Sequence, residues 1–164
     1  MSRAPAFRFA QPGDERLILS FIRGLAEYER MSGEATATEG LLAEWIFEKG
    51  MAEVLFALVD GEEVGFALFS PSFSTFLGRP GIHLEDLYVL PSYRGLGYGR
   101  ALLARLAALA VERGCGRLEW ACLDWNLPGV EFYRALGAAA MDEWTGYRLA
   151  GDGLRALAAE AAGR

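Results

Sequence analysis

A glycine-rich turn between a predicted strand and a predicted long helix constrains the fold of this sequence more than any other feature. Residues 82–89, Ile-His-Leu-Glu-Asp-Leu-Tyr-Val, are typical of a strand, and the apolar stripe over residues 102–110 predicts an amphipathic helix. Between them lies Arg94-Gly95-Leu96-Gly97-Tyr98-Gly99. Glycine allows the backbone to turn tightly and approach a ligand, and the N–H groups that begin a helix attract anions. The turn therefore predicts a cradle for a pyrophosphate, with Arg94 as a charged clamp.

The spacing of these glycines excludes two better-known phosphate loops. A P-loop requires Gly-x-x-x-x-Gly-Lys-Ser/Thr, and the chain contains no such run. A dinucleotide-binding turn requires Gly-x-Gly-x-x-Gly, whereas Gly97-Tyr98-Gly99 is followed by Arg100-Ala101-Leu102. Taken alone, the turn is equally compatible with an ordinary glycine-rich connection into a helix.

The rest of the pattern predicts a mixed α/β or α+β fold around one central sheet. Asp14 is expected to cap a first helix, Thr38 to open a second, and Asp60-Gly61 to connect two strands as a hairpin. We expect strands at 7–9, 54–59, 64–69, 82–89 and 118–123, a loop at 70–81, a helix from Pro128 to Gly137, a hairpin over 138–149 and a helix from Asp152.

Composition limits the partners and cofactors that the chain is expected to use. The 164 residues include 16 Lys+Arg and 22 Asp+Glu, a net charge of −6, which argues against nucleic acid as a partner. One His and two Cys leave little scope for a metal site or a disulfide framework, so we expect no metal and a cytoplasmic location. No apolar run is long enough to cross a membrane and the first residues do not resemble a signal peptide, so no membrane partner is expected.

Four sequence blocks together resemble one family. Arg94-x-x-Gly97-x-Gly99 is similar to the acetyl-CoA pyrophosphate loop of the GNAT N-acetyltransferases, and the chain resembles their diamine (spermidine/spermine-type) and thialysine members. The resemblance implies a GNAT-like single domain over residues 1–164, with a central, mixed, mostly antiparallel sheet flanked by helices. It also implies acetyl-CoA as co-substrate, a small-molecule amine as acceptor and a homodimer. The other three blocks are Leu25-Ala26-Glu27-Tyr28-Glu29-Arg30-Met31, His83-Leu84-Glu85-Asp86-Leu87-Tyr88-Val89 and Trp125-Asn126-Leu127-Pro128-Gly129-Val130-Glu131-Phe132-Tyr133.

The resemblance assigns coenzyme binding to the strand, the turn and Asn126. An open strand edge offers unpaired N–H and C=O groups for the pantetheine arm. Asn126 is alternatively a helix cap, and the two roles are compatible. The residues that the resemblance implies are Leu87, Tyr88, Val89, Arg94, Gly95, Leu96, Gly97, Tyr98, Gly99, Arg100 and Asn126.

The catalytic roles implied by the resemblance fall on Glu85 and Tyr133. An amine with a pKa near 10.4 must lose a proton before it can attack, which at pH 7 costs about 4–5 kcal/mol, and Glu85 is expected to take that proton directly or through a water. Tyr133 is expected to protonate the leaving thiolate. Tyr28, Glu29, Glu85 and Asp86 are expected to bind the acceptor, with Asp86 facing away from Glu85 because strand side chains alternate.

Each of these residues has a simpler interpretation. Glu85 and Asp86 could be strand-end charges, Tyr133 a half-buried packing residue, and Tyr28 with Glu29 a solvated helix end. His83 lies on the same strand face as Glu85 and could tune it, although it lacks the partners of a catalytic triad.

The resemblance leaves the identity of the acceptor amine open. Diamine acetyltransferases carry an acidic residue where this chain has Thr145, which leaves shorter diamines, lysine analogues and amino acids as candidates. The functional alternatives are acetylation of a protein N-terminus or lysine, and a non-catalytic acyl-CoA-binding module. The absence of a Cys or Ser in a nucleophile motif predicts direct attack in a ternary complex.

Overall fold

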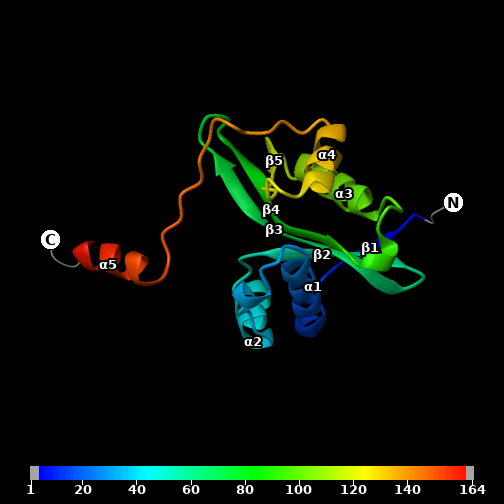
Figure 1. Ribbon diagram of the computed structural model, residues 1–164, viewed down its shortest axis with the longest axis horizontal. Coiled ribbons are helices and arrows are strands. Elements are labelled where there is room, and N and C mark those ends of the chain that lie inside the picture. Colours follow the sequence, from blue (N-terminus) through cyan, green and yellow to red (C-terminus); the bar gives the residue numbers. More distant parts are fainter. Residues whose placement is uncertain (1–3, 162–164) are drawn as a thin grey trace. The chain divides into compact units, whose positions relative to one another are not determined.

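Two units make up the chain in the computed structural model, which describes residues 4–161 (Figure 1). The first unit ends at Leu123 and the second begins at Asp124. The organisation of residues 1–164 as a single domain stays a prediction. No helix within residues 4–161 is long and apolar enough to cross a membrane.

The first unit carries a five-stranded sheet in the order β1-β2-β3-β4-β5. Neighbours from β1 to β4 are antiparallel, and β4 and β5 are parallel. The predicted fold class, a mixed and mostly antiparallel sheet flanked by helices, is therefore confirmed. The elements are β1 (Ala6–Phe9), α1 (Glu15–Tyr28), η1 (Ser32–Glu34), α2 (Glu39–Leu42), η2 (Ala43–Glu48), β2 (Glu53–Val59), β3 (Glu62–Ser74), β4 (Arg79–Val89), η3 (Pro91–Tyr93), α3 (Tyr98–Glu112) and β5 (Leu118–Glu119).

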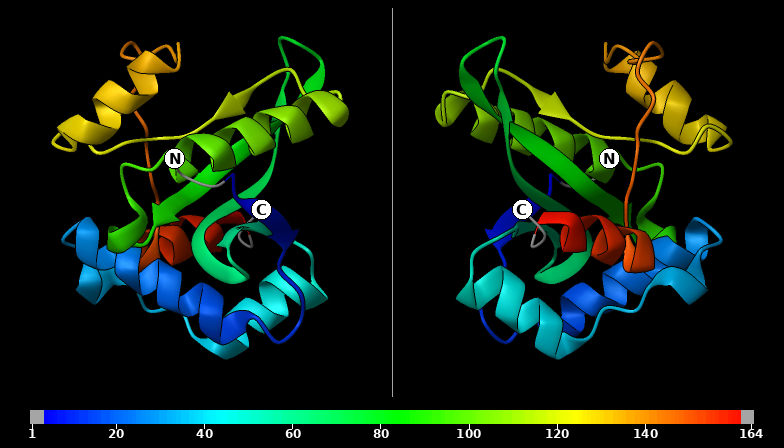
Figure 2. Two further views of the ribbon diagram at one scale, coloured as in Figure 1. Left: turned by 90° about the vertical axis from the view of Figure 1, so that its right-hand side faces the viewer. Right: turned by 90° about the vertical axis from the view of Figure 1, so that its left-hand side faces the viewer.

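Helices cover both faces of this sheet (Figures 1 and 2). On the face of α1, Phe21 stacks on Phe66 with ring centroids 5.2 Å apart, and Ile18 and Phe56 are fully buried beside them. On the opposite face α3 buries Leu102 and Leu106 completely. An apolar helix stripe thus packs on each face, and the helices together bury the centre of the sheet.

The two predicted helix starts differ in how they are capped. Thr38 caps α2 as expected, since its Oγ1 accepts a hydrogen bond from the N–H of Leu41. Asp14 precedes α1 but makes no side-chain cap. Its carboxylate instead accepts hydrogen bonds from both terminal nitrogens of Arg8, at 2.7 and 3.0 Å, and Arg8 lowers the pKa of Asp14. A charged partner on β1 has displaced the expected cap.

The loop predicted over residues 70–81 is too long, since only residues 75–78 form a turn. β3 continues to Ser74, β4 begins at Arg79, and their ladder extends as far as the Ser74–Arg79 pair. Pro71 is tolerated because β2 stops at Glu53, opposite Phe69, so that this part of β3 has no partner on its other side. The pairing with β4 thus outweighs the local Ser and Pro signals.

A β-bulge interrupts β4 at Glu85. Leu84 pairs with Phe69 and Asp86 pairs with Leu68, so Glu85 is an extra residue without an opposite partner. Phe69 faces α3, where Arg113 lies over its ring, whereas Leu68 packs in the core beneath α1. Paired residues share a face, and Asp86 therefore faces α1. The prediction that Asp86 faces away from Glu85 is wrong, because the bulge resets the alternation.

The second unit contains α4 (Leu127–Ala135) and α5 (Gly151–Ala161). The predicted hairpin over residues 138–149 is wrong, since the structure has no strand there. The run from Ala138 to Gly146 is dominated by Ala, Asp, Glu and Gly, which are poor strand formers, and an isolated hairpin is only marginally stable. The strand predicted over 118–123 is likewise shorter and ends at Glu119.

Candidate active site

Three carboxylates come together where α1 ends beside the β4 bulge. Glu29 follows the last residue of α1, and Glu85 and Asp86 are the bulged residues of β4. Their charges act on one another, since Glu85 raises the pKa of both Glu29 and Asp86. All three were predicted from the sequence as acceptor-binding residues, and the structure brings them to one place.

Burial makes Asp86 the most perturbed group of the three. Desolvation raises its pKa to about 6, and the neighbouring charges of Glu85 and Glu29 add to the effect. The pKa of Glu29 is also raised, again chiefly by burial. Carboxylates crowded in this way favour the binding of a cation, because a positive charge relieves their repulsion. The arrangement is suited to an ammonium group.

His83 lies beside this cluster. Its Nε2 is 3.0 Å from Oε2 of Glu85, and the two residues share the α1 face of the strand as predicted. Across the sheet His83 pairs with Ser70 of β3 and with Glu119 of β5.

Arg94 connects the end of β4 with α1. Its Nε donates a hydrogen bond of 2.9 Å to the carbonyl oxygen of Val89. Its guanidinium lies over the ring of Tyr28 at 4.8 Å and over that of Tyr88 at 5.1 Å. Tyr28, predicted to bind the acceptor, therefore lies beside the predicted coenzyme clamp. The clamping role of Arg94 itself stays a prediction.

The glycine-rich turn has the backbone conformation that an anion cradle requires. Gly95 and Gly97 have φ values of 73° and 88°, a region that other residues rarely adopt, and no atom lies within 4 Å of a Cβ at either position. Gly97 is the N-cap of α3. Tyr98 is buried, so it can offer only its backbone, whereas Leu96 and Arg100 are exposed. The open loop and the helix start fit a pyrophosphate.

The edge of β4 beyond His83 has room for a strand-like ligand. β5 pairs with β4 only at Ile82 and His83. For Leu87 to Val89 the described ladder runs only along β3. The side chain of Tyr88 is buried against α1, so this segment too offers backbone groups. These groups match the strand-like pairing expected for the pantetheine arm.

Asn126 and Tyr133 belong to the second unit, which is described by itself. Asn126 caps α4 by accepting a hydrogen bond of 3.3 Å from the N–H of Gly129, which confirms its capping role. Tyr133 is half-buried on α4, with its ring 5.3 Å from that of Phe132. The coenzyme role of Asn126 and the acid role of Tyr133 stay predictions.

One positioning feature escaped the sequence analysis. A Cβ at Gly24 of α1 would lie only 2.8 Å from the hydroxyl oxygen of Tyr88, so glycine there makes room for the ring on which Arg94 rests. A glycine inside a strong helical pattern was the available signal, because it costs helix stability unless something needs the space.

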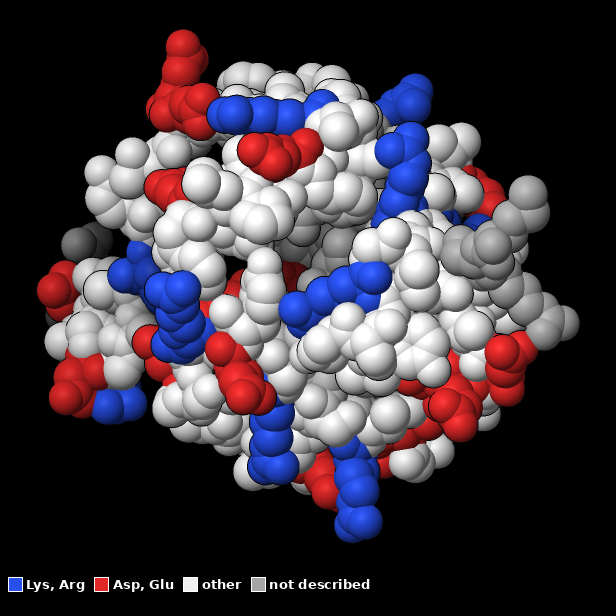
Figure 3. Space-filling view, turned by 45° about the vertical axis from the view of Figure 1, so that its right-hand side comes forward, with Lys and Arg blue, Asp and Glu red and all other residues white. Residues whose placement is uncertain are grey.

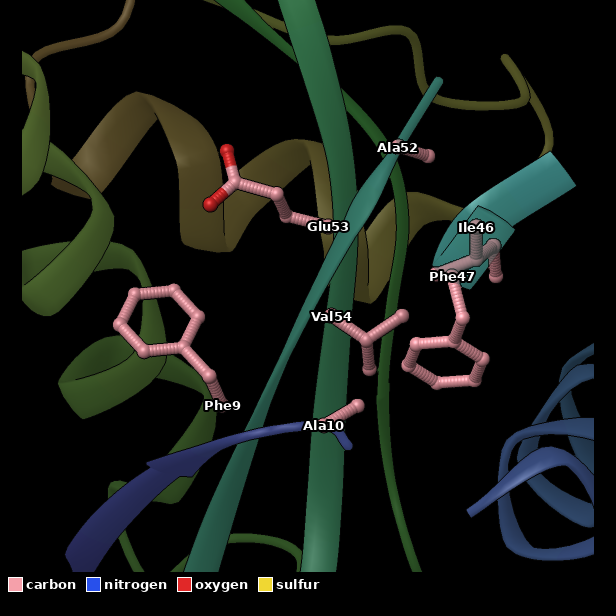
Figure 4. A pocket seen from close by; sticks show the side chains of 7 residues that line it. All are labelled: Phe9, Ala10, Ile46, Phe47, Ala52, Glu53 and Val54. Carbon is pink, nitrogen blue, oxygen red and sulfur yellow. The ribbon is translucent and has the colours of Figure 1, made fainter. Parts of the chain in front are cut away.

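A separate pocket lies where β1 and β2 meet η2 (Figure 4). Val54, Phe47 and Ala10 line one part of it, while Glu53 points to the other side of the strand. Both carboxylate oxygens of Glu53 accept hydrogen bonds from Arg113, at 2.6 and 2.8 Å. None of the predicted site residues lines this pocket, and its one carboxylate is already paired.

The distribution of surface charge does not indicate a second candidate site. On the face shown in Figure 3, basic and acidic side chains are interspersed. Within residues 4–161, no group of three or more His, Cys, Asp and Glu is arranged to hold a metal ion. The expected absence of nucleic-acid and metal partners stays a prediction.

Comparison with known proteins gives consistent matches. A model of the acetyltransferase (GNAT) family matches residues 20–138, which include the acidic cluster and the glycine-rich turn. Thialysine N-epsilon-acetyltransferase of Bos taurus is 39% identical over 163 residues, covering 92% of this chain and 95% of that protein. L-ornithine N5-acetyltransferase of Arabidopsis thaliana is 42% identical over 93 residues, covering 57% and 41%. Among solved structures, an integron cassette protein from the mobile metagenome of V. cholerae superposes with a TM-score of 0.79 at 28% identity, covering 95% of this chain and 98% of that one.

Proposed function

The chain belongs to the acetyltransferase (GNAT) family, and on that premise we propose that it acetylates the terminal amine of a small basic amino acid. It is an acetyl-CoA-dependent N-acetyltransferase that acts on a small amine acceptor. The narrower acceptor class rests on two relatives, whose names specify thialysine and L-ornithine. Thr145 supports this choice over a long polyamine, because one carboxylate that a second distant ammonium would need is missing.

The acidic cluster is the observation that carries the proposal. Asp86 and Glu29 are crowded and partly desolvated beside Glu85, so they bind the positive charge of the acceptor. Glu85 is the most exposed of the three and takes the proton that the ammonium must lose. The neutral amine then attacks the thioester carbonyl of acetyl-CoA directly, so that the C–N bond forms and the C–S bond breaks. The nitrogen loses its second proton to water as the amide forms, and Tyr133 regains from water the proton that it gives to the thiolate. The carboxylates thus assist the deprotonation of the ammonium, which at pH 7 costs about 4–5 kcal/mol.

Backbone groups and two arginines bind the coenzyme. Residues 95–99 and the start of α3 bind the pyrophosphate, with Arg94 and Arg100 as cations beside it. Leu87, Tyr88 and Val89 pair with the pantetheine arm through their backbone, and Asn126 contacts the coenzyme while capping α4. Tyr133 donates its hydroxyl proton to the leaving thiolate.

The proposal is tested by measuring thiol release from acetyl-CoA with a panel of amines. The panel contains ornithine, lysine, thialysine, putrescine, spermidine and a lysine-containing peptide. We expect the highest kcat/KM for the basic amino acids, a lower value for spermidine and none for the peptide. A preference for the peptide would support a protein acetyltransferase instead. Coenzyme binding without turnover on any amine would support the non-catalytic alternative and contradict the proposal.

We also infer a homodimer, as the family resemblance implies. Support comes from the tip of the β3–β4 hairpin, where Phe73 near the end of β3 and Phe76 and Leu77 in the turn are 63%, 99% and 54% exposed. Apolar surface of this kind is typical of contacts between proteins. Light scattering is expected to give twice the 17.9 kDa of the single chain at micromolar concentration. A mass of one chain would contradict the inference.

We also propose a cytoplasmic location, on the basis of the two cysteines. Neither Cys115 nor Cys122 forms a disulfide in the structure. Thiols that form no disulfide are usual where the environment is reducing.

A further inference from the structure

His83 and Glu85 form a pair whose geometry depends on the bulge. Nε2 of His83 is 3.0 Å from Oε2 of Glu85, and their side chains are 43% and 65% exposed. Side chains two apart on a strand share a face, and the extra residue in β4 brings Asp86 to that face as well. The imidazole of His83 thus hydrogen-bonds the carboxylate of the proposed base.

We propose that His83 is a positioning residue that orients the Glu85 carboxylate and relays to solvent the proton that Glu85 takes from the acceptor. This inference rests on the proposed function. In the relay, protonated Glu85 gives its proton to Nε2 of His83, which leaves a carboxylate and an imidazolium, and the imidazolium then releases one proton to water. No other reactant is consumed. Imidazole is suited to this exchange because it can take up and release a proton near neutral pH.

The charges around the pair give the transfer its direction. Asp86 and Glu29 lie on the acceptor side of Glu85, and each is shielded from water enough to raise its pKa. A bound acceptor with acetyl-CoA would further restrict water there. On the other side, His83 faces Ser70 of β3 and Glu119 of β5, whose carboxylate is ion-paired with Arg117. The imidazole is hydrogen-bonded to Glu85 and exposed, so the relay leads from the carboxylate towards solvent and away from the acceptor.

The test compares His83→Ala and His83→Gln with the wild type, using an acceptor on which the wild type turns over. We expect His83→Ala to lower kcat about 10-fold, at the low end of the range for proton transfer, with KM for acetyl-CoA unchanged. His83→Gln keeps a hydrogen bond to Glu85 but cannot carry a proton, so it should recover only part of the loss. Free imidazole should raise kcat of His83→Ala, because the site is exposed enough for it to enter. Ser70→Ala, opposite His83 on β3, is the control and should keep wild-type kcat with no response to imidazole.

A double variant shows whether His83 acts through Glu85. In a Glu85→Gln background, His83→Ala should lower kcat no further, and imidazole should have no effect. Wild-type kcat in His83→Ala, or a loss that imidazole does not relieve, would overturn the relay while leaving the acetyltransferase activity intact. Absence of turnover in the wild type with every amine would instead overturn the proposed function.

Discussion

Glu85→Gln is expected to lower kcat about 100-fold at pH 7, within the range for loss of a general base. The amide cannot accept the ammonium proton, yet it has nearly the same size and stays in the same exposed bulge position. KM for acetyl-CoA should be unchanged, because the proposed coenzyme contacts lie at residues 87–89, residues 94–100 and Asn126 and do not include Glu85. Steady-state kinetics with ornithine or the best acceptor of the panel measures both values.

The pH dependence of Glu85→Gln gives a sharper check. Deprotonation of the acceptor by solvent becomes easier as the pH approaches the pKa of the amine, about 10.4. The ratio of wild-type to variant kcat should therefore shrink steadily between pH 7 and pH 10. A ratio that stays constant with pH, or a variant with wild-type kcat, would remove Glu85 from the proton-transfer role.

Asp86→Asn is the matched comparison for this variant. Because Asp86 is proposed to bind the acceptor cation, its amide should raise KM for the amine more than it lowers kcat. A loss of folding stability in Asp86→Asn is not expected to contribute to the change in KM. Burial raises the pKa of Asp86 to about 6, so the folded state binds more protons than the unfolded state between about pH 4 and pH 6, and stability falls as the pH rises through that window. At pH 8 Asp86→Asn should thus melt no lower than the wild type.

The parts of the fold that local chemistry determines were predictable from the sequence. Asp60 and Gly61 both have φ values in the left-handed region, 52° and 88°, as the hairpin turn requires. Thr38 and Asn126 cap their helices, and Gly137 has φ 84° just beyond α4. In each case one or two residues decide the conformation, so the sequence pattern alone is sufficient.

Features that depend on distant pairing were not predictable in the same way. Residues 70–81 carry loop signals, and only the pairing of β3 with β4 makes residues 70–74 and 79–81 strand and limits the turn to residues 75–78. The orientation of Asp86 depends on a single extra residue in β4, since a one-residue change of register moves every later side chain to the other face. The composition of the acidic cluster could be inferred from the resemblance, but its shared face could not.

Tyr133→Phe is the second variant with a large expected effect. The thiolate of the coenzyme needs a proton as it leaves, and replacing the phenol by a phenyl ring removes that proton donor and nothing else of the side chain. We expect kcat to fall about 100-fold while acetyl-CoA still binds, because backbone groups of the first unit are proposed to hold the pyrophosphate and pantetheine. Calorimetry with coenzyme A and single-turnover acetyl transfer separate the two effects.

The control for Tyr133→Phe is the same chemical change elsewhere in the second unit. Tyr147 is 95% exposed, so Tyr147→Phe removes a hydroxyl group without altering a packed side chain and should keep wild-type kcat. The two variants together distinguish loss of a specific acid from a general effect of removing a phenol. If Tyr133→Phe matched Tyr147→Phe in kcat, the leaving thiolate would have to take its proton from water, and the half-buried ring of Tyr133 would serve only to pack beside Phe132.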